Sequence, residues 1–169
     1  GIRRWSNKSD HEGYNAGYFI GAALAHHTLT GGKDTRLYDA ARRLADCWCA
    51  SIGPSPKIRW YEGHEELEQT LVRLAWYVDG QEGPGKGAKY LALAKYLLDA
   101  RGGGDEYDQS HLPLARQYEA LGHSVRAVYC YSGLAAVAME TRDTDYLSAA
   151  RSLWLLDLVS EADIRVEHL

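Results

Sequence analysis

Residues 59–69, RWYEGHEELEQ, concentrate aromatic rings, a histidine and carboxylates in one short segment. Sugar-binding sites use this combination, because rings stack on the faces of a sugar while polar groups bind its hydroxyls. Acidic residues are also common in the first turn of a helix, where they interact with the helix dipole. The glutamates therefore have a structural interpretation, whereas Trp60, Tyr61 and His64 are candidate sugar-binding residues.

Two further segments carry residues of the same kinds ahead of apolar stretches. SDHEGYN contains His11 and Glu12, and DQSHLPLARQYEALGH contains His111 and His123. Glu12 also has a structural interpretation as a first-turn acid. If all three apolar stretches are helices that start at one end of the molecule, these polar groups gather there.

The segment around Pro113 predicts the start of a helix, because the missing N–H of proline costs nothing in a first turn. In that helix, steps of three, four and three residues place four polar side chains on one face: Arg116, Glu119, His123 and Arg126. This stripe is either a solvated helix end with an Arg–Glu pair or the polar mouth of a pocket. Both interpretations remain open at this point.

Motifs for metal binding and for common catalytic centres are absent from the sequence. Cys47 and Cys49 form C-x-C, whose spacing on a helix points the thiols apart, and no histidine follows at zinc-finger spacing. G-x-S-x-G, H-E-x-x-H and a phosphate-binding loop are also missing. We therefore predict no metal, no cofactor and no motif-defined catalytic residue in this chain.

The charge balance bears on partners and compartment. The 169 residues carry a formal charge of −4 and no run of five like charges, so neither nucleic acid nor a membrane is an expected partner. The three cysteines are too few and odd in number for a disulfide framework, which agrees weakly with a cytoplasmic location. No signal peptide is recognised, and the start without methionine suggests a piece of a longer protein.

An internal repeat indicates how these residues are positioned. LYDAARRLAD, YLALAKYLLD and YLSAARSLWL share aligned alanines at Ala41, Ala94 and Ala150. Turn residues precede each copy, as expected where one helix ends and the next begins. The repeat predicts three helical hairpins, near residues 11–53, 63–102 and 111–159, within a single all-α domain over residues 1–169.

The two helices of each hairpin differ in pattern. Residues 36–48 are amphipathic, which is typical of an outer helix, whereas residues 16–25 and 127–139 carry almost no charge and indicate buried inner helices. This alternation favours an (α/α) toroid or a solenoid over a bundle of independent helices. The fold class predicted here is all-α, with three αα-hairpins forming about half of an (α/α)6 toroid.

Several blocks also resemble a known family. RWSNKSDHEGYNAGYFIGAALAHHTLTG, YEGHEELEQTLVRLAWYVDG, YDQSHLPLARQYEALGHSVRAVYCYSGLAAVA and YLSAARSLW are similar, in this order, to family 127 glycoside hydrolases, typified by bacterial β-L-arabinofuranosidases. The resemblance implies an (α/α)6 catalytic barrel, of which this chain is the N-terminal half, and cleavage of terminal β-L-arabinofuranose with retention. It also implies that His64 and His111 reach the sugar, and it places His123 in a matching motif. Where the family often has H-E-L-Y-x-x-G-H, this sequence has Gly13 for Leu and Tyr18 for His, which suggests a changed sugar preference.

The resemblance also shows what the chain lacks. The family uses a zinc-bound cysteine as nucleophile, held by further cysteines and a glutamate in later segments, and none of Cys47, Cys49 and Cys130 occupies those positions. Zinc is thus expected only in the complete enzyme. Our leading hypothesis is a glycosidase fragment that binds a small sugar or an oligosaccharide. The alternative is a non-catalytic helical-repeat module that binds a sugar or a protein. Half a toroid should also expose an apolar flank and self-associate through it.

Overall fold

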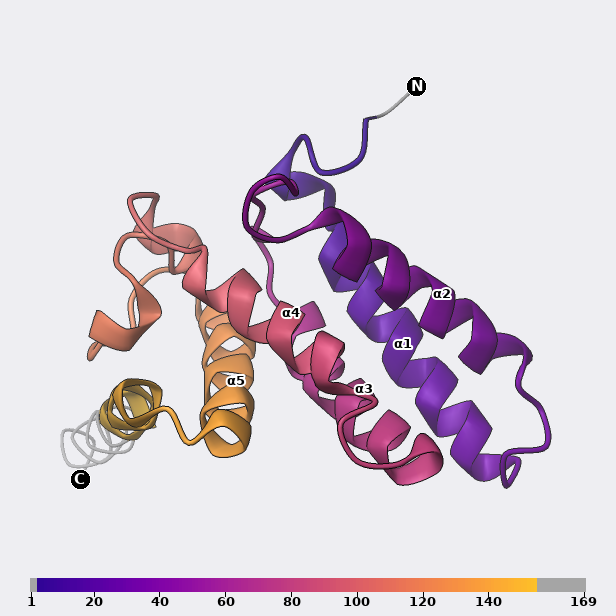
Figure 1. Ribbon diagram of the computed structural model, residues 1–169. Coiled ribbons are helices and arrows are strands. Elements are labelled where there is room, and N and C mark those ends of the chain that lie inside the picture. Colours follow the sequence, from indigo (N-terminus) through magenta and orange to yellow (C-terminus); the bar gives the residue numbers. More distant parts are fainter. Residues whose placement is uncertain (1–2, 155–169) are drawn as a thin grey trace, which may run out of the picture.

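The computed structural model describes residues 3–154, which form helices joined by loops (Figure 1). α1 (Glu12–Leu29) pairs with α2 (Arg36–Ser51), and α3 (Leu67–Glu82) pairs with α4 (Ala88–Asp99). α5 (Ser124–Thr141) is followed by a helix over residues 144–154. Within the described residues the backbone forms no β-strand, and three short 3-10 helices lie at Lys8–Asp10, Glu106–Asp108 and Leu114–Arg116. The predicted all-α class with three hairpins is confirmed.

The inner and outer helices are those that the residue patterns predict. α3 packs against α1 on one side and α5 on the other, and α2 and α4 cover them from outside. α2 buries residues of one face only: Tyr38, Ala41, Ala45 and Trp48. α3 buries residues on most of its circumference, including Leu71 and Leu74 at 0% exposure, each of which contributes about 1.5–3 kcal/mol. The central helix therefore packs into the core on most sides, between α1, α4 and α5.

The helix predicted from Pro113 is wrong. Pro113 precedes only the short 3-10 helix, and α5 begins at Ser124. Arg116 ends that 3-10 helix and Glu119 lies in the loop after it, both exposed, so the predicted stripe does not form. Two buried glutamines hold the intervening loop instead: the Gln117 amide donates to the carbonyls of Gln109 and Leu112 at 2.8 and 2.7 Å, and the Gln109 amide donates to Leu121 at 2.8 Å. These side chains replace the backbone bonds that a helix would have made.

A close approach of α1 to the start of α3 requires a glycine. A Cβ added at Gly17 would lie 2.7 Å from the Glu66 Cγ and 3.0 Å from the Leu67 backbone nitrogen. Because the second contact is to backbone, a rotamer change cannot relieve it. Gly17 thus sets the distance between the N-terminal halves of two inner helices.

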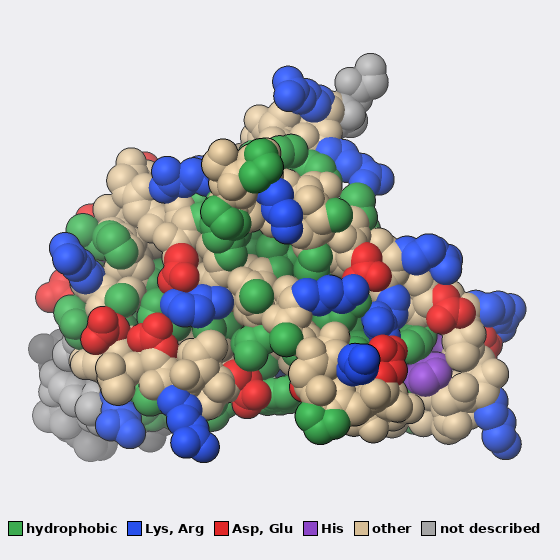
Figure 2. All heavy atoms as spheres, viewed as in Figure 1, with side chains coloured by type: hydrophobic (Ala, Val, Ile, Leu, Met, Phe, Trp, Pro, Cys, Tyr) green, Lys and Arg blue, Asp and Glu red, His purple; other side chains and the backbone are tan. Residues whose placement is uncertain are grey.

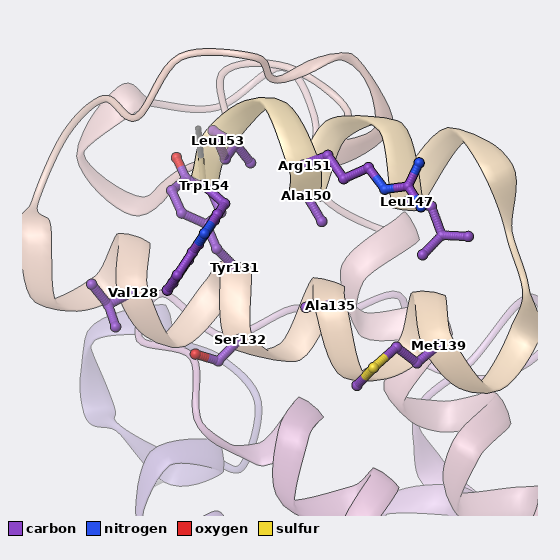
Figure 3. Close-up of a pocket in the computed structure, with 10 residues that line it drawn as sticks. All are labelled: Val128, Tyr131, Ser132, Ala135, Met139, Leu147, Ala150, Arg151, Leu153 and Trp154. Carbon is purple, nitrogen blue, oxygen red and sulfur yellow. The ribbon is translucent and has the colours of Figure 1, made fainter. Parts of the chain in front are cut away.

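The third hairpin leaves an apolar groove open on the flank of the molecule (Figure 3). Val128, Tyr131, Ser132, Ala135 and Met139 of α5 face five residues of the following helix across a hollow of about 520 Å³: Leu147, Ala150, Arg151, Leu153 and Trp154. Three side chains at its edge are strongly exposed, at 64% for Val128, 61% for Met139 and 69% for Trp154. Self-association through this flank stays a prediction.

Other parts of the surface are mixed in character. Figure 2 shows acidic and basic side chains interspersed with hydrophobic ones over the face that it presents. Among the described residues, no helix is both long and apolar enough to cross a membrane. The division into a single domain over residues 1–169 remains a prediction, and residues 155–159 of the third predicted repeat lie outside the described part.

We expect Gly17→Ala to lower the free energy of unfolding by about 1–3 kcal/mol, because the methyl group forces α1 and α3 apart. Urea denaturation measures the change. The matched control is Gly21→Ala in the same helix, where an added Cβ meets nothing within 4 Å. This control should gain up to about 1 kcal/mol from helix propensity. Equal effects of the two substitutions would contradict the close-approach argument.

For the apolar flank we expect a mass above that of the monomer in light scattering at increasing protein concentration. Val128→Glu or Met139→Glu should shift the mass toward the monomer, because a charge in the groove opposes its burial. Leu29→Glu is the control, since Leu29 is 87% exposed and lies at the end of α1, outside the groove. A monomeric wild type at every concentration would refute the prediction.

Candidate functional site

The N-terminal ends of α1, α3 and α5 meet at one end of the molecule. His64 lies just before α3, and its ring is 5.6 Å from His11, 4.4 Å from Tyr14 and 5.5 Å from Tyr129, measured between ring centroids. His11 is the N-cap of α1, Tyr14 lies in its first turn, and Tyr129 comes from α5. Residues far apart in sequence therefore form one aromatic cluster, which we call the His64 cluster.

Hydrogen bonds select one tautomer for both histidines of this cluster. The Nδ1 of His64 donates to the Glu65 carbonyl at 3.1 Å, and the Nδ1 of His11 donates to the Ser9 carbonyl at 2.7 Å. A neutral imidazole that donates from Nδ1 keeps its Nε2 as an acceptor. Both rings are half-buried, so each Nε2 can accept a bond from a ligand hydroxyl.

The environment of His64 favours its neutral form. Burial lowers the pKa of His64, and the positive charge of Arg126 and the neighbouring His11 and His123 lower it further. The bond to the Glu65 carbonyl acts in the opposite direction but does not outweigh burial. His64 is consequently an uncharged hydrogen-bonding group near neutral pH.

The start of α5 completes this end of the molecule. The Arg126 guanidinium donates to the Gly63 carbonyl, and its carbon lies 4.7 Å from the centre of the Tyr107 ring. Tyr107 also contacts the His123 ring at 5.3 Å, and the His123 Nδ1 caps α5 by accepting from the Arg126 backbone. His123 is thus fixed beside Arg126 and within electrostatic range of His64.

A buried ion cluster lies beneath the His64 cluster. Arg101, at 2% exposure, pairs with Glu65 at 2.8 Å and approaches Glu68 at 4.0 Å. The same guanidinium donates to the carbonyls of Glu62 and Asp108. One cation therefore joins the segment that carries His64 to the loop that carries His111.

The carboxylates outnumber the cation in this cluster. Burial raises the pKa of Glu62 to about 7 and that of Glu65 to about 8, with Arg101 opposing the rise at Glu65. Burial also raises the pKa of Glu68, again against the attraction of Arg101. Burial and the nearby Glu65 raise the pKa of the Cys130 thiol, which is 0% exposed. The interior beneath the site therefore favours protonated acids and an inert thiol.

Three of the predicted sugar-binding residues have structural contacts that compete with that role. Trp60 is only 7% exposed and donates its indole N–H to Glu62 at 3.0 Å, so its ring faces are covered by the core. Tyr61 is half-buried, with the Lys8 ammonium 3.3 Å from its ring centre and Arg101 at 5.0 Å. Glu12 accepts from the Trp5 backbone at 2.8 Å and lines a separate hollow with residues of α2.

His111 is half-buried in the loop before α5. Within residues 3–154 it makes no ring contact with the His64 cluster, and its buried Nδ1 has no hydrogen-bond partner. Buried polar atoms normally have a partner, so this nitrogen is available for a water or a ligand. The roles of His64, His111, His123, Glu12, Trp60 and Tyr61 in sugar binding all stay predictions.

Sequence reasoning missed most of the residues that surround His64. Tyr14 and Tyr129 were not selected, Tyr18 was noted only as a departure from the family motif, and His11 was noted without a role. The signal was present, because His11, Tyr14 and Tyr18 follow steps of three and four on one helix face. Tyr129 has no comparable signal, since only the packing of α5 on α3 brings it to this site.

The described residues do not fit a zinc site. No group of three or more His, Cys, Asp and Glu side chains between residues 3 and 154 is arranged to hold a metal ion. The buried Cys130 lies beside Arg101, whose positive charge opposes metal binding there. Zinc in the complete family enzyme therefore stays a prediction about residues outside this chain.

We expect the free energy of unfolding to fall as the pH rises from about 6.5 to about 9. The raised pKa values of Glu62 and Glu65 mean that the folded chain retains protons that the unfolded chain releases near pH 4.5. The associated stability is complete below that pH and is lost as the pH passes through about 7 and 8. The lowered pKa of His64 makes stability rise with pH instead, but above about pH 7 His64 is unprotonated in both the folded and the unfolded chain and adds no slope.

Urea denaturation across this pH range measures the slope. Glu62→Gln is neutral at every pH and should flatten it, whereas Glu119→Gln, on the exposed loop, should leave it unchanged. A Glu62→Gln protein with the wild-type slope would show that Glu62 is ionised in the folded state.

Comparisons with known proteins give one family for this chain and the same helical fold. The family model for the β-L-arabinofuranosidase GH127 catalytic domain matches residues 1–160. A protein of Bifidobacterium longum subsp. longum named non-reducing end β-L-arabinofuranosidase is 31% identical over 172 residues, which cover 87% of this chain and 25% of the relative.

Solved structures give the same result. A GH127 β-L-arabinofuranosidase from Geobacillus stearothermophilus T6 matches with a TM-score of 0.79 and 34% identity. The matched region is 89% of this chain and 26% of the Geobacillus chain. A second GH127 β-arabinofuranosidase matches with a TM-score of 0.80 and 41% identity. The matched region is 91% of this chain and 24% of that second chain. The chain thus spans about a quarter of the length of these relatives. With the family model matching nearly its whole length, this chain belongs to the GH127 β-L-arabinofuranosidase family of glycoside hydrolases, as part of the catalytic domain.

Proposed function

We propose that the His64 cluster binds the terminal sugar of an arabinofuranoside, and that the complete protein hydrolyses this sugar with retention of configuration. The observation that carries the proposal is the pair of histidines, His11 and His64, that are held in one tautomer with Nε2 as acceptor. Names of relatives, which include β-L-arabinofuranosidase, support the sugar class.

The chemistry of the cluster suits an uncharged, hydroxyl-rich ligand. His64 supplies a neutral acceptor, and Tyr14 and Tyr129 supply hydroxyls and ring faces next to it. Aromatic faces beside directional hydrogen-bonding groups are what a sugar ring requires. His111 is a second candidate, because its buried Nδ1 lacks a partner, and it lies on the loop that Arg101 ties to the His64 segment.

The chemical step needs groups beyond those described. Retaining glycosidases use an acid and a nucleophile on either side of the glycosidic bond. Cys130 is a poor candidate nucleophile, because it is fully buried and its pKa is raised. We therefore assign sugar binding to this chain and no catalytic residue.

A non-catalytic module that binds a sugar or a protein on its helical surface is the second candidate. The apolar groove beside α5 favours it, because such a groove is a common site for a partner helix. The two candidates differ in their dependence on His64, which lies outside that groove.

Isothermal titration with L-arabinose and with methyl β-L-arabinofuranoside tests the proposal. We expect binding by the wild-type chain, with His64→Ala and His111→Ala each weakening it about tenfold or more, because each removes a directional hydrogen bond from a half-buried site. His26→Ala is the matched control. His26 lies in the last turn of α1, where it pairs with Asp34 at 3.7 Å, far along the helix from the site.

The control should bind as the wild type does. Wild-type affinity in His64→Ala would contradict the proposal, and so would an absence of binding by the wild type at millimolar sugar. Either result would favour the module.

A further inference from the structure

The segment that carries His64 has no regular backbone structure, so its carbonyls need donors from side chains. Residues 61–66 form neither helix nor strand, and α3 begins after them at Leu67. Three carbonyls of this segment accept hydrogen bonds: Glu62 from Arg101, Gly63 from Arg126, and Glu65 from the Nδ1 of His64 at 3.1 Å. These bonds replace those that a helix or a strand would supply. Two arginines and His64 itself therefore fix the backbone here.

The two arginines differ in how deeply they lie. Arg101 is 2% exposed and pairs with buried carboxylates, so its loss would leave unpaired charges in the interior. Arg126 is half-buried in the first turn of α5 and forms no ion pair within residues 3–154. Its guanidinium carbon lies 4.7 Å from the centre of the ring of Tyr107, a residue that is 53% exposed. Arg126 can therefore be changed without breaking the buried ion cluster.

Gly63 is enclosed between Arg126 and the 3-10 helix at Lys8–Asp10. A Cβ added at Gly63 would lie 2.8 Å from the Lys8 carbonyl oxygen and 3.4 Å from the Arg126 Nη1. His11 follows that 3-10 helix directly, and its ring centroid is 5.6 Å from that of His64. The bond from Arg126 thus fixes Gly63 at the point where the segments of the two histidines meet.

We infer that Arg126 is a positioning residue for His64. Its bond to the Gly63 carbonyl fixes the backbone from which the imidazole projects. In that position the Nδ1 of His64 meets the Glu65 carbonyl, and the Nε2 is left as an acceptor. The consequence for sugar binding rests on the proposed function, whereas the consequence for the imidazole does not.

Arg126 also acts on His64 through its charge. Burial is the main cause of the lowered pKa of His64, and the positive charge of Arg126 adds to it. The titratable and charged residues around His64 come from its own segment and from both neighbouring segments: Glu65, Glu66, Lys8, His11, Tyr14, His123, Arg126 and Tyr129. Loss of the guanidinium therefore affects both the orientation and the charge state of the imidazole.

The test observes His64 directly by long-range proton–nitrogen NMR of the isotope-labelled whole chain, with its signals identified by their loss in His64→Ala. In the wild type we expect the tautomer protonated at Nδ1 to dominate. In Arg126→Gln the ratio of this tautomer to the other should fall about threefold to tenfold, as expected when one hydrogen bond is weakened. The pKa of His64 should rise, because a neighbouring positive charge is lost.

Arg126→Lys separates position from charge. The ammonium keeps the charge, so the pKa of His64 should stay lowered. It lacks the planar guanidinium that packs on Tyr107 and bonds the Gly63 carbonyl, so the tautomer ratio should still fall. Arg73→Gln is the matched control, because it removes the same charge from an exposed arginine of α3, and it should change neither quantity.

A wild-type tautomer ratio in both Arg126 variants, with folding checked by circular dichroism, would overturn the inference. If Arg126→Gln does not fold, Arg126→Lys decides by the same criterion. Isothermal titration with methyl β-L-arabinofuranoside should show binding that is about threefold to tenfold weaker in Arg126→Gln and unchanged in Arg73→Gln. A wild type that binds no sugar would refute the proposed function, while the spectra still decide the role of Arg126.

Discussion

The buried guanidinium of Arg101 is the interaction on which this end of the molecule depends. Arg101 lies just after α4. It pairs with the carboxylates of Glu65, before α3, and Glu68, in α3, and it donates to the carbonyls of Glu62, before α3, and Asp108, in the loop after α4. A buried cation without partners would cost several kcal/mol, so the fold is committed to keeping these groups together. His64 and His111 are therefore positioned through one shared anchor, although the residues of each segment are far apart in sequence.

Burial determines the electrical character of the site. It raises the pKa values of Glu62 and Glu65, at Glu65 against the charge of Arg101, and it lowers the pKa of His64 together with the charge of Arg126. His64 thus presents a neutral hydrogen-bonding group beside the rings of Tyr14 and Tyr129, with the Arg126 guanidinium bound to the Gly63 carbonyl next to it. A neutral hydrogen-bonding group beside aromatic rings suits the sugar that the proposed function assigns to this site.

The sequence pattern was sufficient for the architecture because helical hairpins have a strong periodic signal. The repeated alanines at positions 41, 94 and 150 and the amphipathic pattern of α2 predicted the outer helices correctly. The loop between α4 and α5 was not predictable in the same way. Its conformation depends on Gln109 and Gln117, whose amides bind backbone carbonyls several residues away, and no local propensity reveals such bonds.

The same contrast between a local sequence pattern and long-range packing decides which residues of the candidate site could be predicted. His64 stood out because a histidine amid carboxylates before an apolar helix is unusual in type, whereas Tyr129 became relevant only through packing. Trp60 was selected by type as well, yet its indole serves Glu62 in the core. Residue type thus identifies groups capable of chemistry, and burial decides which of them a ligand can reach. Tyr18 is exposed and Tyr14 and Tyr129 are half-buried, whereas Glu62, Glu65 and Glu68 are buried, so solvent reaches the tyrosines and not the acids.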